Sequence, residues 1–367
     1  MSAASSPATV RVSVAEEMRL ATAVLGALGV PEADAWLQAH WLVEGDRRGY
    51  GSHGIQRLVL LAKRITRGVA DPSAQPTFEW RGDSLLDVDG NRGLGPVVAI
   101  RALEEAYPRS RVSGVVLVAI SNANHLGMLA PYLEWLTERS LIGIALTTSE
   151  ALVHPWGGRR AMVGTNPLAI GVPTHPRPLV VDLATGTVSM GKILRHCELG
   201  LPLERGWAVD AAGQPTLDPA AALDGAISPF GGAKGFALGL AFEVFVGALT
   251  RSALGRDVVG TLDADAICNK GDVFICIDPA TLGDSAARLA AVSDYLALLR
   301  SEPPQEGAAG VRLPGDRAAK AREASALSGV ELPARVWQET LDLASDLHID
   351  LGRAGGTDTT SSTSSRE

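Results

Sequence analysis

The segment at residues 180–193, VVDLATGTVSMGKI, constrains this chain more than any other. An apolar, β-branched run gives way to small residues and ends in Gly191 and Lys192, a composition suited to a backbone that approaches phosphate groups. The segment also satisfies the G-x-x-x-x-G-K pattern of phosphate-binding loops and follows an apolar strand, as that motif requires. It therefore predicts a strand that leads into a turn facing an anion.

Two observations argue against the common folds that use such a turn. Ile193 occupies the position at which a Ser or Thr hydroxyl must bind Mg²⁺, and Asp278, at the end of another apolar strand, is followed by Pro279. No G-x-G-x-x-G motif is present, so a standard dinucleotide-binding fold has no support. A phosphate-loop nucleotide hydrolase remains the weaker alternative, and Lys192 remains a candidate partner for a phosphate in a different architecture.

Length, charge and cysteine content exclude several classes of protein. The 367 residues suffice for two or three domains or one large interwoven α/β unit. A formal net charge of −8 argues against nucleic acid as a partner. No apolar stretch reaches the ~20 residues that span a bilayer, and the N-terminus lacks a signal-peptide pattern. The three cysteines, Cys197, Cys268 and Cys276, are not spaced as zinc ligands. We expect a cytoplasmic protein without a metal site, in which these thiols are buried or inert.

Apolar residues at helical spacing dominate both ends of the chain, whereas the middle is β-rich. We expect two helices between residues 13 and 47, divided at Pro31, a third at 55–69, and further helices at 283–349, one of them capped by Asp316. A hairpin is expected at 77–91, with Asp89-Gly90 as its turn signal. Further strands are expected at 114–121, 141–149, 168–174, 179–184 and 272–278, and helices at 94–107, 128–139 and 234–250.

This pattern predicts an α/β fold with helical N- and C-terminal parts around a β-rich domain. We assign residues 1–73 to an N-terminal helical part, beginning with a loose leader at 1–9, and 74–280 to a central, cofactor-binding domain. Residues 281–350 are expected to form C-terminal helices that pack back on the N-terminal part, and 351–367 a disordered polar tail.

The motif GSHGIQR at residues 51–57 holds the candidate chemistry. His53 falls at the start of a predicted helix, and imidazole is the side chain most often used to move a proton near neutral pH. Arg57 follows four residues later, so the two side chains can share a helical face. A guanidinium binds a carboxylate bidentately, and the pair therefore favours a reaction at a carbon next to a carboxylate. A histidine satisfied by local hydrogen bonds is the alternative interpretation.

Two further turns carry candidate residues. SNANHLG at 121–127 places His125 at a strand end, where α/β proteins hold functional groups, although a turn stabilised by Asn and Ser side chains explains it equally well. PFGGAKG at 229–235 opens an apolar helix with glycines and Lys234, a composition suited to an anion. A glycine-rich turn with a solvated lysine is the alternative there.

In their order and spacing, these segments and those at 155–169, 206–219 and 271–279 make the chain similar to the malate/L-lactate dehydrogenase type-2 family, from about residue 13 to 336. The family includes ureidoglycolate, sulfolactate and diketogulonate oxidoreductases and the reductases of piperideine- and pyrroline-2-carboxylate. The resemblance implies the non-Rossmann fold of L-sulfolactate dehydrogenase. It also implies a homodimer that uses NADH or NADPH to transfer hydride to or from C2 of a 2-hydroxy/2-oxo acid or a cyclic 2-imino acid.

The resemblance further implies a role for each motif residue. His53 matches the acid/base histidine, with Ser52 and Asp182 as supporting neighbours that set the imidazole's tautomer, and Arg57 matches the residue that pairs with the substrate carboxylate. His125 is expected beside the nicotinamide and the substrate, and Thr165 in the substrate site. Cofactor contacts are expected at Asp182, Leu183, Ala184, Thr185, Lys192, Lys234, Gly235, Pro314, Gly315 and Asp316.

Three positions depart from the family pattern. One is Asp316, which follows Pro314-Gly315 where the family usually carries a glutamate. Gly51 stands where the family carries an acidic residue, and Leu61 stands where it often carries a tyrosine. Without that hydroxyl the pocket should be more apolar, which favours a bulkier or less polar acid over malate or lactate. A catalytically silent family member that binds ligand is a further alternative, against which the joint presence of Ser52, His53 and Arg57 argues.

Overall fold

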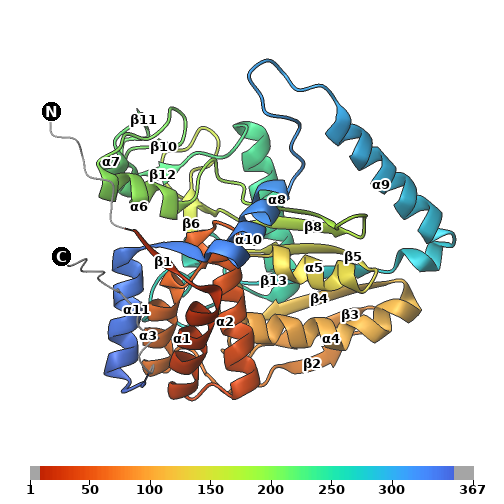
Figure 1. The fold of residues 1–367 in the computed structure, drawn as a ribbon, viewed down its shortest axis with the longest axis horizontal. Coiled ribbons are helices and arrows are strands. Elements are labelled where there is room, and N and C mark those ends of the chain that lie inside the picture. The colour runs from red at the N-terminus through yellow and green to blue at the C-terminus, as the bar shows by residue number, and fades with distance from the viewer. Residues whose placement is uncertain (1–8, 351–367) are drawn as a thin grey trace, which may run out of the picture.

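The computed structural model describes residues 9–350, so most of the predicted leader and the whole predicted tail lie outside the described residues. The body of the molecule is built on a seven-stranded sheet (Figure 1) in which only β3 and β4 pair in parallel. Its strands, in spatial order, are β2 (Thr77–Trp80), β3 (Leu85–Asp89), β4 (Val115–Ser121), β13 (Asp272–Ile277), β5 (Ile142–Thr147), β8 (Leu168–Val172) and β9 (Leu179–Leu183).

Helices cover both faces of this sheet, which explains why the central strand β13 is apolar on both sides. Phe274 and Cys276 belong to the core formed with α4 (Gly95–Ser113) and α5 (Ala130–Glu138). Val273 and Ile275, one position out of phase, pack with α8 (Ala233–Thr250) on the opposite face. This alternation follows from the two-residue period of a strand.

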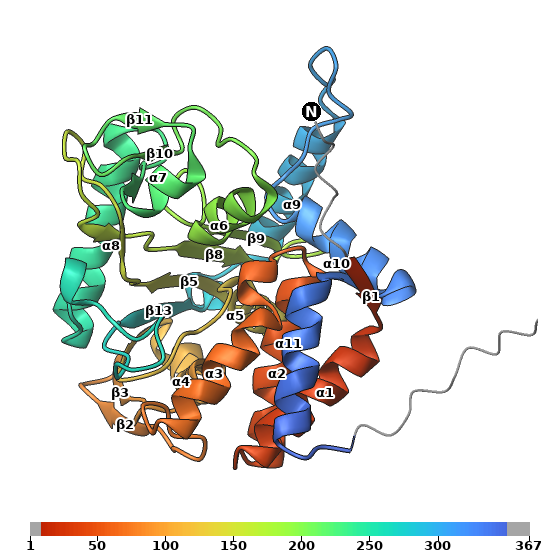
Figure 2. The same ribbon diagram turned by 90° about the vertical axis from the view of Figure 1, so that its left-hand side faces the viewer.

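A helical layer stands beside the sheet and joins the two ends of the described chain (Figure 2). It contains α1 (Val14–Ala27), α2 (Glu32–Arg47), α3 (Gln56–Thr66) and α11 (Ala334–Asp346), which share one apolar core. A two-stranded sheet of β1 (Thr9–Val12) and β14 (Val330–Pro333) closes this layer. Neither strand was predicted from the sequence, because four residues between helical segments carry little periodic signal.

The C-terminal helices do not all pack where we expected. Helix α10 (Asp316–Ser328) lies against α2, and α11 lies against α1 and α3. Helix α9 (Ser285–Ser301) instead projects from the body (Figure 1), so the prediction that residues 281–350 pack back on the N-terminal helices is wrong for α9.

A smaller lobe adjoins the main sheet and contains the segment that resembled a phosphate loop. Its five strands, in spatial order, are β11 (Pro215–Thr216), β10 (Ala208–Val209), β12 (Ala226–Ile227), β6 (Ala151–Val153) and β7 (Val163–Gly164), and its helices are α6 (Met190–Leu199) and α7 (Pro219–Leu223). Ile193 is fully buried in the core of this lobe, beside Trp207 and Ile227. An apolar residue at this position is therefore required by packing, and a Mg²⁺-binding hydroxyl has no place there.

Three local predictions need correction. The hairpin turn lies at residues 81–84 and not at Asp89-Gly90, and α4 continues past Pro108 to Ser113. Of the three cysteines, which were expected to be buried or inert, Cys268 and Cys276 are buried and Cys197 is exposed. Asp316 is the first residue of α10, and the cap position belongs to Gly315, whose φ of 84° suits a glycine. Each error concerns a boundary that neighbouring elements fix rather than the local sequence.

Helix α8 is long and apolar enough to cross a membrane by length and composition, with a mean hydropathy of 1.4, although we expected no such segment. Only 28% of it is buried. Four large apolar side chains, Leu238, Leu240, Val244 and Phe245, are exposed on it. The described part of the chain therefore leaves one apolar helix face uncovered.

Candidate active site

A 3₁₀ turn, η1 (Gly51–His53), links α2 to α3 and presents Ser52 and His53 at the start of α3, as predicted. The buried Asp46 fixes this turn, because its Oδ2 accepts the backbone N–H of Ile55 at 2.5 Å. A Cβ at Gly54 would collide with the Asp46 carboxylate, so the position requires glycine. The catalytic candidates are thus carried by a short turn that is bonded to a buried acid.

Four charged or titratable side chains, His53, Arg57, Arg64 and His125, line one cavity between α2, α3, α4 and the loop after β4. The rings of His53 and His125 stack with centroids 5.5 Å apart and planes within 7°. The other residues that line the cavity are Gln38, Trp41, Leu42, Leu60, Leu61, Pro96, Asn124, Gly127, Gly260 and Thr261. The structure therefore brings together three predicted site residues from two segments of the chain.

Both histidines are neutral at pH 7. Burial, and then the nearby Arg57, lower the pKa of His53 to about 4. Burial also lowers the pKa of His125 well below 6.5, with the charges of Arg57 and other neighbours adding to the effect. The N–H of Gly127 donates to His125 Nδ1 at 3.0 Å, so the proton of the neutral ring sits on Nε2. His125 can therefore donate a hydrogen bond from Nε2.

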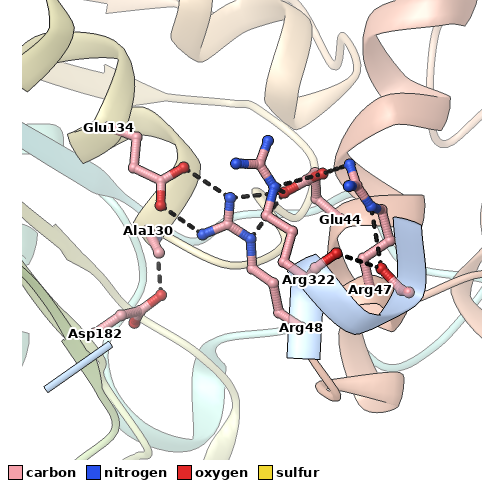
Figure 3. A network of polar contacts seen from close by, with 8 residues as sticks. Glu44, Arg47, Arg48, Ala130, Glu134, Asp182 and Arg322 are labelled. Carbon is pink, nitrogen blue, oxygen red and sulfur yellow. Dashed lines mark hydrogen bonds and ion pairs between the residues drawn. The ribbon is translucent and has the colours of Figure 1, made fainter. Parts of the chain in front are cut away.

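Asp182 does not support His53 in the way we expected. Its Oδ2 accepts the N–H groups of Leu129 (3.0 Å) and Ala130 (2.8 Å) at the start of α5, and Figure 3 shows it pointing to that helix. Burial raises its pKa to about 6 against the effect of these hydrogen bonds. Between residues 9 and 350, neither Asp182 nor Ser52 hydrogen-bonds to His53, and His53 Nδ1 is buried without a partner. The prediction that either residue sets the tautomer of His53 is therefore wrong for this structure.

Arg57 is held in place by two backbone carbonyl groups. Its Nε donates to Ser52 O at 2.9 Å and its Nη1 to Thr261 O at 3.1 Å. Burial lowers the pKa of Arg57, and the nearby Glu150 carboxylate opposes this effect. Glu150 itself accepts the N–H groups of Thr261 and Leu262. The guanidinium is therefore oriented, and its Nη2 is not committed to any described residue.

Sequence reasoning missed three of the cavity's polar residues, Arg64, Asn124 and Thr261. Arg64 stands seven residues after Arg57 on the same helix, so helical periodicity could have indicated a shared face. Thr261 lies in the loop between α8 and β13, and no local signal marks it. Leu61, the departure from the family's tyrosine, lines the cavity together with Leu60 and Trp41.

The predicted cofactor residues at the end of β9 lie beside the start of α8. Thr185 donates from its backbone N–H and from Oγ1 to Thr165 O, at 2.8 and 2.9 Å, and the N–H of Phe230 donates to Thr185 O. Leu183 and Ala184 are exposed next to this junction, and Lys234 is exposed in the first turn of α8. Thr165 belongs to this group and is not among the described residues that line the His53 cavity.

The remaining cofactor candidates occupy separate positions. Lys192 Nζ lies 4.2 Å from the centre of the Trp207 ring on the smaller lobe. Asp316 pairs with Arg177 and accepts the N–H of Leu313 at 2.9 Å, so its carboxylate binds other residues of the chain and stabilises the fold. A Cβ at Gly191 would come within 2.9 Å of Ser52 Cβ. The two most informative sequence motifs therefore touch each other at Gly191 and Ser52.

Comparison with known proteins gives a consistent result. A model of the malate/L-lactate dehydrogenase family matches residues 12–340. The chain is 34% identical over 341 residues to L-sulfolactate dehydrogenase of Methanothermobacter thermautotrophicus, covering 93% of this chain and 98% of that protein. It is also 34% identical over 340 residues to Delta(1)-pyrroline-2-carboxylate reductase 1 of Burkholderia ambifaria, covering 92% and 98%. A similar relative in Chromohalobacter salexigens, (2R)-3-sulfolactate dehydrogenase (NADP(+)), is 34% identical over 330 residues and covers 89% and 96%.

Solved structures match over the same length. A dehydrogenase from Sinorhizobium meliloti superposes with a TM-score of 0.88 at 47% identity, covering 92% of this chain and 98% of that one. Sulfolactate dehydrogenase from Methanocaldococcus jannaschii superposes with a TM-score of 0.88 at 32% identity, covering 93% and 98%. The fold expected from the sequence is confirmed.

Proposed function

The chain belongs to the malate/L-lactate dehydrogenase family of NAD(P)-dependent dehydrogenases and reductases, and on this basis we propose how its own residues perform the reaction. We propose that hydride passes between the nicotinamide of NADH or NADPH and C2 of a small 2-oxo, 2-hydroxy or cyclic 2-imino acid. The observation that carries the proposal is the stacked pair His53–His125 beside Arg57 in one cavity. The family match leaves no support for the phosphate-loop alternative, and the assembled cavity argues against a silent member.

In this proposal Arg57 binds the substrate carboxylate. Ser52 O and Thr261 O orient its guanidinium before substrate arrives, which leaves Nη2 for the carboxylate and lowers the entropy cost of placing C2. The negative charge of this carboxylate also offsets the positive charge of Arg57, which lowers the pKa of His53. Substrate binding therefore favours a protonated His53 when proton donation is required.

His53 moves the proton. In the oxidising direction the neutral ring accepts the proton of the C2 hydroxyl, and in the reducing direction the protonated ring returns it to the developing alkoxide or amine. His125, with its proton on Nε2, donates a hydrogen bond to the same oxygen or to the nicotinamide amide. The bound nicotinamide supplies or accepts the hydride.

The junction of β9 and α8 fits an anionic cofactor. Gly231 and Gly232 adopt positive φ values of 58° and 65° before the first turn of an 18-residue helix. The free N–H groups of such a turn and the exposed Lys234 favour a diphosphate. Asp182, Leu183, Ala184, Thr185 and Gly235 would line this site from the adjacent strand and helix.

We propose that the chain forms a homodimer in the cytoplasm, in which the exposed apolar side chains of α8 are covered by a second copy. Leu238, Leu240, Val244 and Phe245 are each at least 40% exposed on this helix, and clustered exposed apolar side chains mark interaction surfaces. The buried Glu243, which accepts the N–H of Gly164, ties the other face of α8 to its own subunit.

The deciding experiment measures oxidation of NADH and NADPH against pyruvate, oxaloacetate, phenylpyruvate, a branched 2-oxo acid and piperideine-2-carboxylate. Turnover of any member supports the proposal, and the best substrate separates ketone from imine reduction. His53→Ala should lose at least two orders of magnitude in kcat and retain cofactor binding, since an acid/base group contributes roughly 10²–10⁴-fold. Near-normal turnover by this variant would refute the role of His53.

A further inference from the structure

Arg64 is a second guanidinium in the substrate cavity that the reaction proposed above does not use. It stands on α3 seven residues after Arg57, and about two helical turns separate the two Cα atoms. Arg64 is 4% exposed, yet it lines the same cavity as His53, Arg57 and His125. No ion pair within 4 Å joins it to a carboxylate of the described residues.

Neutral oxygen atoms hold Arg64 in place. Its Nε donates to Asn124 Oδ1 at 3.1 Å, and its Nη1 donates to Asp263 O at 2.7 Å. Arg57 is held in the same manner by the carbonyls of Ser52 and Thr261. The loop between α8 and β13 therefore helps to orient both guanidiniums through backbone carbonyl groups. The carboxylates of Asp263 and Glu150 interact electrostatically with Arg64 and Arg57, but no carboxylate of the described residues lies within 4 Å of either guanidinium.

The cavity contains hydrogen-bond donors that have no acceptor. Arg64 Nη2 and Trp41 Nε1 are buried and have no hydrogen-bond partner among residues 9–350, and both side chains line the cavity. A buried donor without a partner costs about 1–3 kcal/mol, and more when it is charged, so such groups call for an acceptor. The charges of Arg57 and Arg64 both contribute to the lowered pKa of His125.

The nearest acidic groups are already committed elsewhere. The Asp263 carboxylate accepts the N–H groups of Gly260, Asp265 and Ala266, and Glu150 accepts those of Thr261 and Leu262. No Asp or Glu is among the described residues that line the cavity. The missing anion must therefore come from the ligand.

We propose that Arg64, with Trp41, binds a second acidic group of the substrate. This inference rests on the proposed hydride transfer at C2, and it names the substrate class: a 2-oxo or 2-hydroxy acid that carries a further carboxylate or sulfonate. Arg57 takes the carboxylate next to C2 and Arg64 takes the distal one. A cyclic 2-imino acid has no distal anion, and its protonated ring nitrogen would be repelled by the two guanidiniums.

The test compares each diacid with a monoacid of similar shape. Values of kcat/KM are measured for oxaloacetate against 4-methyl-2-oxopentanoate and for 2-oxoglutarate against 5-methyl-2-oxohexanoate, with 3-sulfopyruvate as the sulfonate. We expect kcat/KM of the wild type to be about 10- to 100-fold higher for the better of the two diacids than for its matched monoacid. One charge-assisted hydrogen bond contributes a free energy of this size. Arg64→Gln should remove this preference by lowering kcat/KM for the diacid much more than for the matched monoacid, and Arg64→Lys should retain part of the preference. Arg67→Gln, at the exposed residue that follows α3, should leave the preference intact.

A second measurement separates this inference from the proposed function. Binding of succinate and of 3-methylbutanoate is followed by tryptophan fluorescence, since Trp41 lines the cavity. An Arg64-dependent preference for succinate without turnover of any 2-oxo acid supports the anion site and refutes the hydride-transfer role. Equal turnover of diacid and monoacid, or equal losses on both in Arg64→Gln, overturns the inference. The inference is also overturned if Arg64→Gln weakens only the binding of NADPH, because Arg64 would then contact the cofactor and not the substrate.

Discussion

His53 and His125 share one cavity with two guanidiniums, and this neighbourhood determines the protonation of both rings. Burial and Arg57 lower the pKa of His53 to about 4, so its neutral form predominates at neutral pH. In the free enzyme, kcat/KM for hydroxy-acid oxidation should therefore stay flat between about pH 6 and 8 and fall only near pH 4. In the reducing direction kcat/KM should decline as the pH rises above 4, because the protonated ring becomes scarcer.

Arg57→Met provides the control for this pH profile. It removes one cause of the lowered pKa of His53, so the acidic limb of the oxidation profile should move upward. KM for carboxylate substrates should rise as well, more than it does for an uncharged ketone. A wild-type limb at the ordinary histidine value would contradict the burial of His53.

Glu17 is a buried acid that stabilises the protein only while it is protonated. It is fully buried beside Asp46, the acid whose carboxylate accepts the N–H of Ile55 after the η1 turn. Burial and the neighbouring Asp46 raise its pKa to about 10. The folded state therefore binds more protons than the unfolded state above pH 4.5, and the unfolding free energy should fall as the pH rises toward 10.

Glu17→Gln should flatten this dependence. The variant should be more stable than the wild type at pH 8, and the difference should shrink toward pH 5, as measured by denaturant unfolding at each pH. Glu32→Gln, an exposed change on α2, should leave the wild-type slope unchanged. If Glu17→Gln and Glu32→Gln both retain the pH dependence of the wild-type unfolding free energy, the group that titrates is not Glu17.

At the scale of elements, Glu44 connects α2 with α10. Its carboxylate accepts hydrogen bonds from Arg47 of α2 and from Arg48, which follows this helix, and pairs with Arg322 of α10 (Figure 3). Arg48 extends the network to Glu134 of α5 through bonds of 2.6 and 2.7 Å. The network therefore joins the helical layer to the helices of the main sheet.

Glu44→Ala should lower the unfolding free energy by about 3–5 kcal/mol, because it leaves the buried Arg48 with one partner fewer. Arg322→Met removes a half-exposed member of the same network and should cost less than about 1 kcal/mol. Chemical denaturation of both variants measures the contrast. Equal losses of unfolding free energy in the two variants would show that Glu44 contributes no more to the network than Arg322 does.

At the scale of the whole molecule, the uncovered face of α8 predicts self-association. Val244 is 52% exposed in the middle of this face. Val244→Glu should convert a dimer to a monomer in size-exclusion chromatography with light scattering, since a charge cannot be buried there without a partner. Leu327→Glu, at a 93% exposed position on α10, should leave the dimer intact. A monomeric wild type would refute the proposed dimer.

Much of the fold follows from local sequence. The helices α1, α2 and α3, the strands of the main sheet and the start of α8 were predicted from periodicity, because each buries one face and the apolar spacing records it. The position of His53 and Arg57 at the start of a helix followed in the same way. Short elements such as β14 and α6 were missed, since packing rather than propensity stabilises them.

The sequence by itself determined the family, the motif residues and the architecture of a β-rich middle between helical ends. Only the tertiary structure decided which side chains share the cavity. It placed His125 against His53, directed Asp182 to the backbone of α5, and brought Thr261 and Arg64 beside Arg57. These contacts join segments up to 204 residues apart, and no local pattern encodes them. The physical reason is that the charge, burial and hydrogen bonding of a site depend on its neighbours in space, which folding alone supplies.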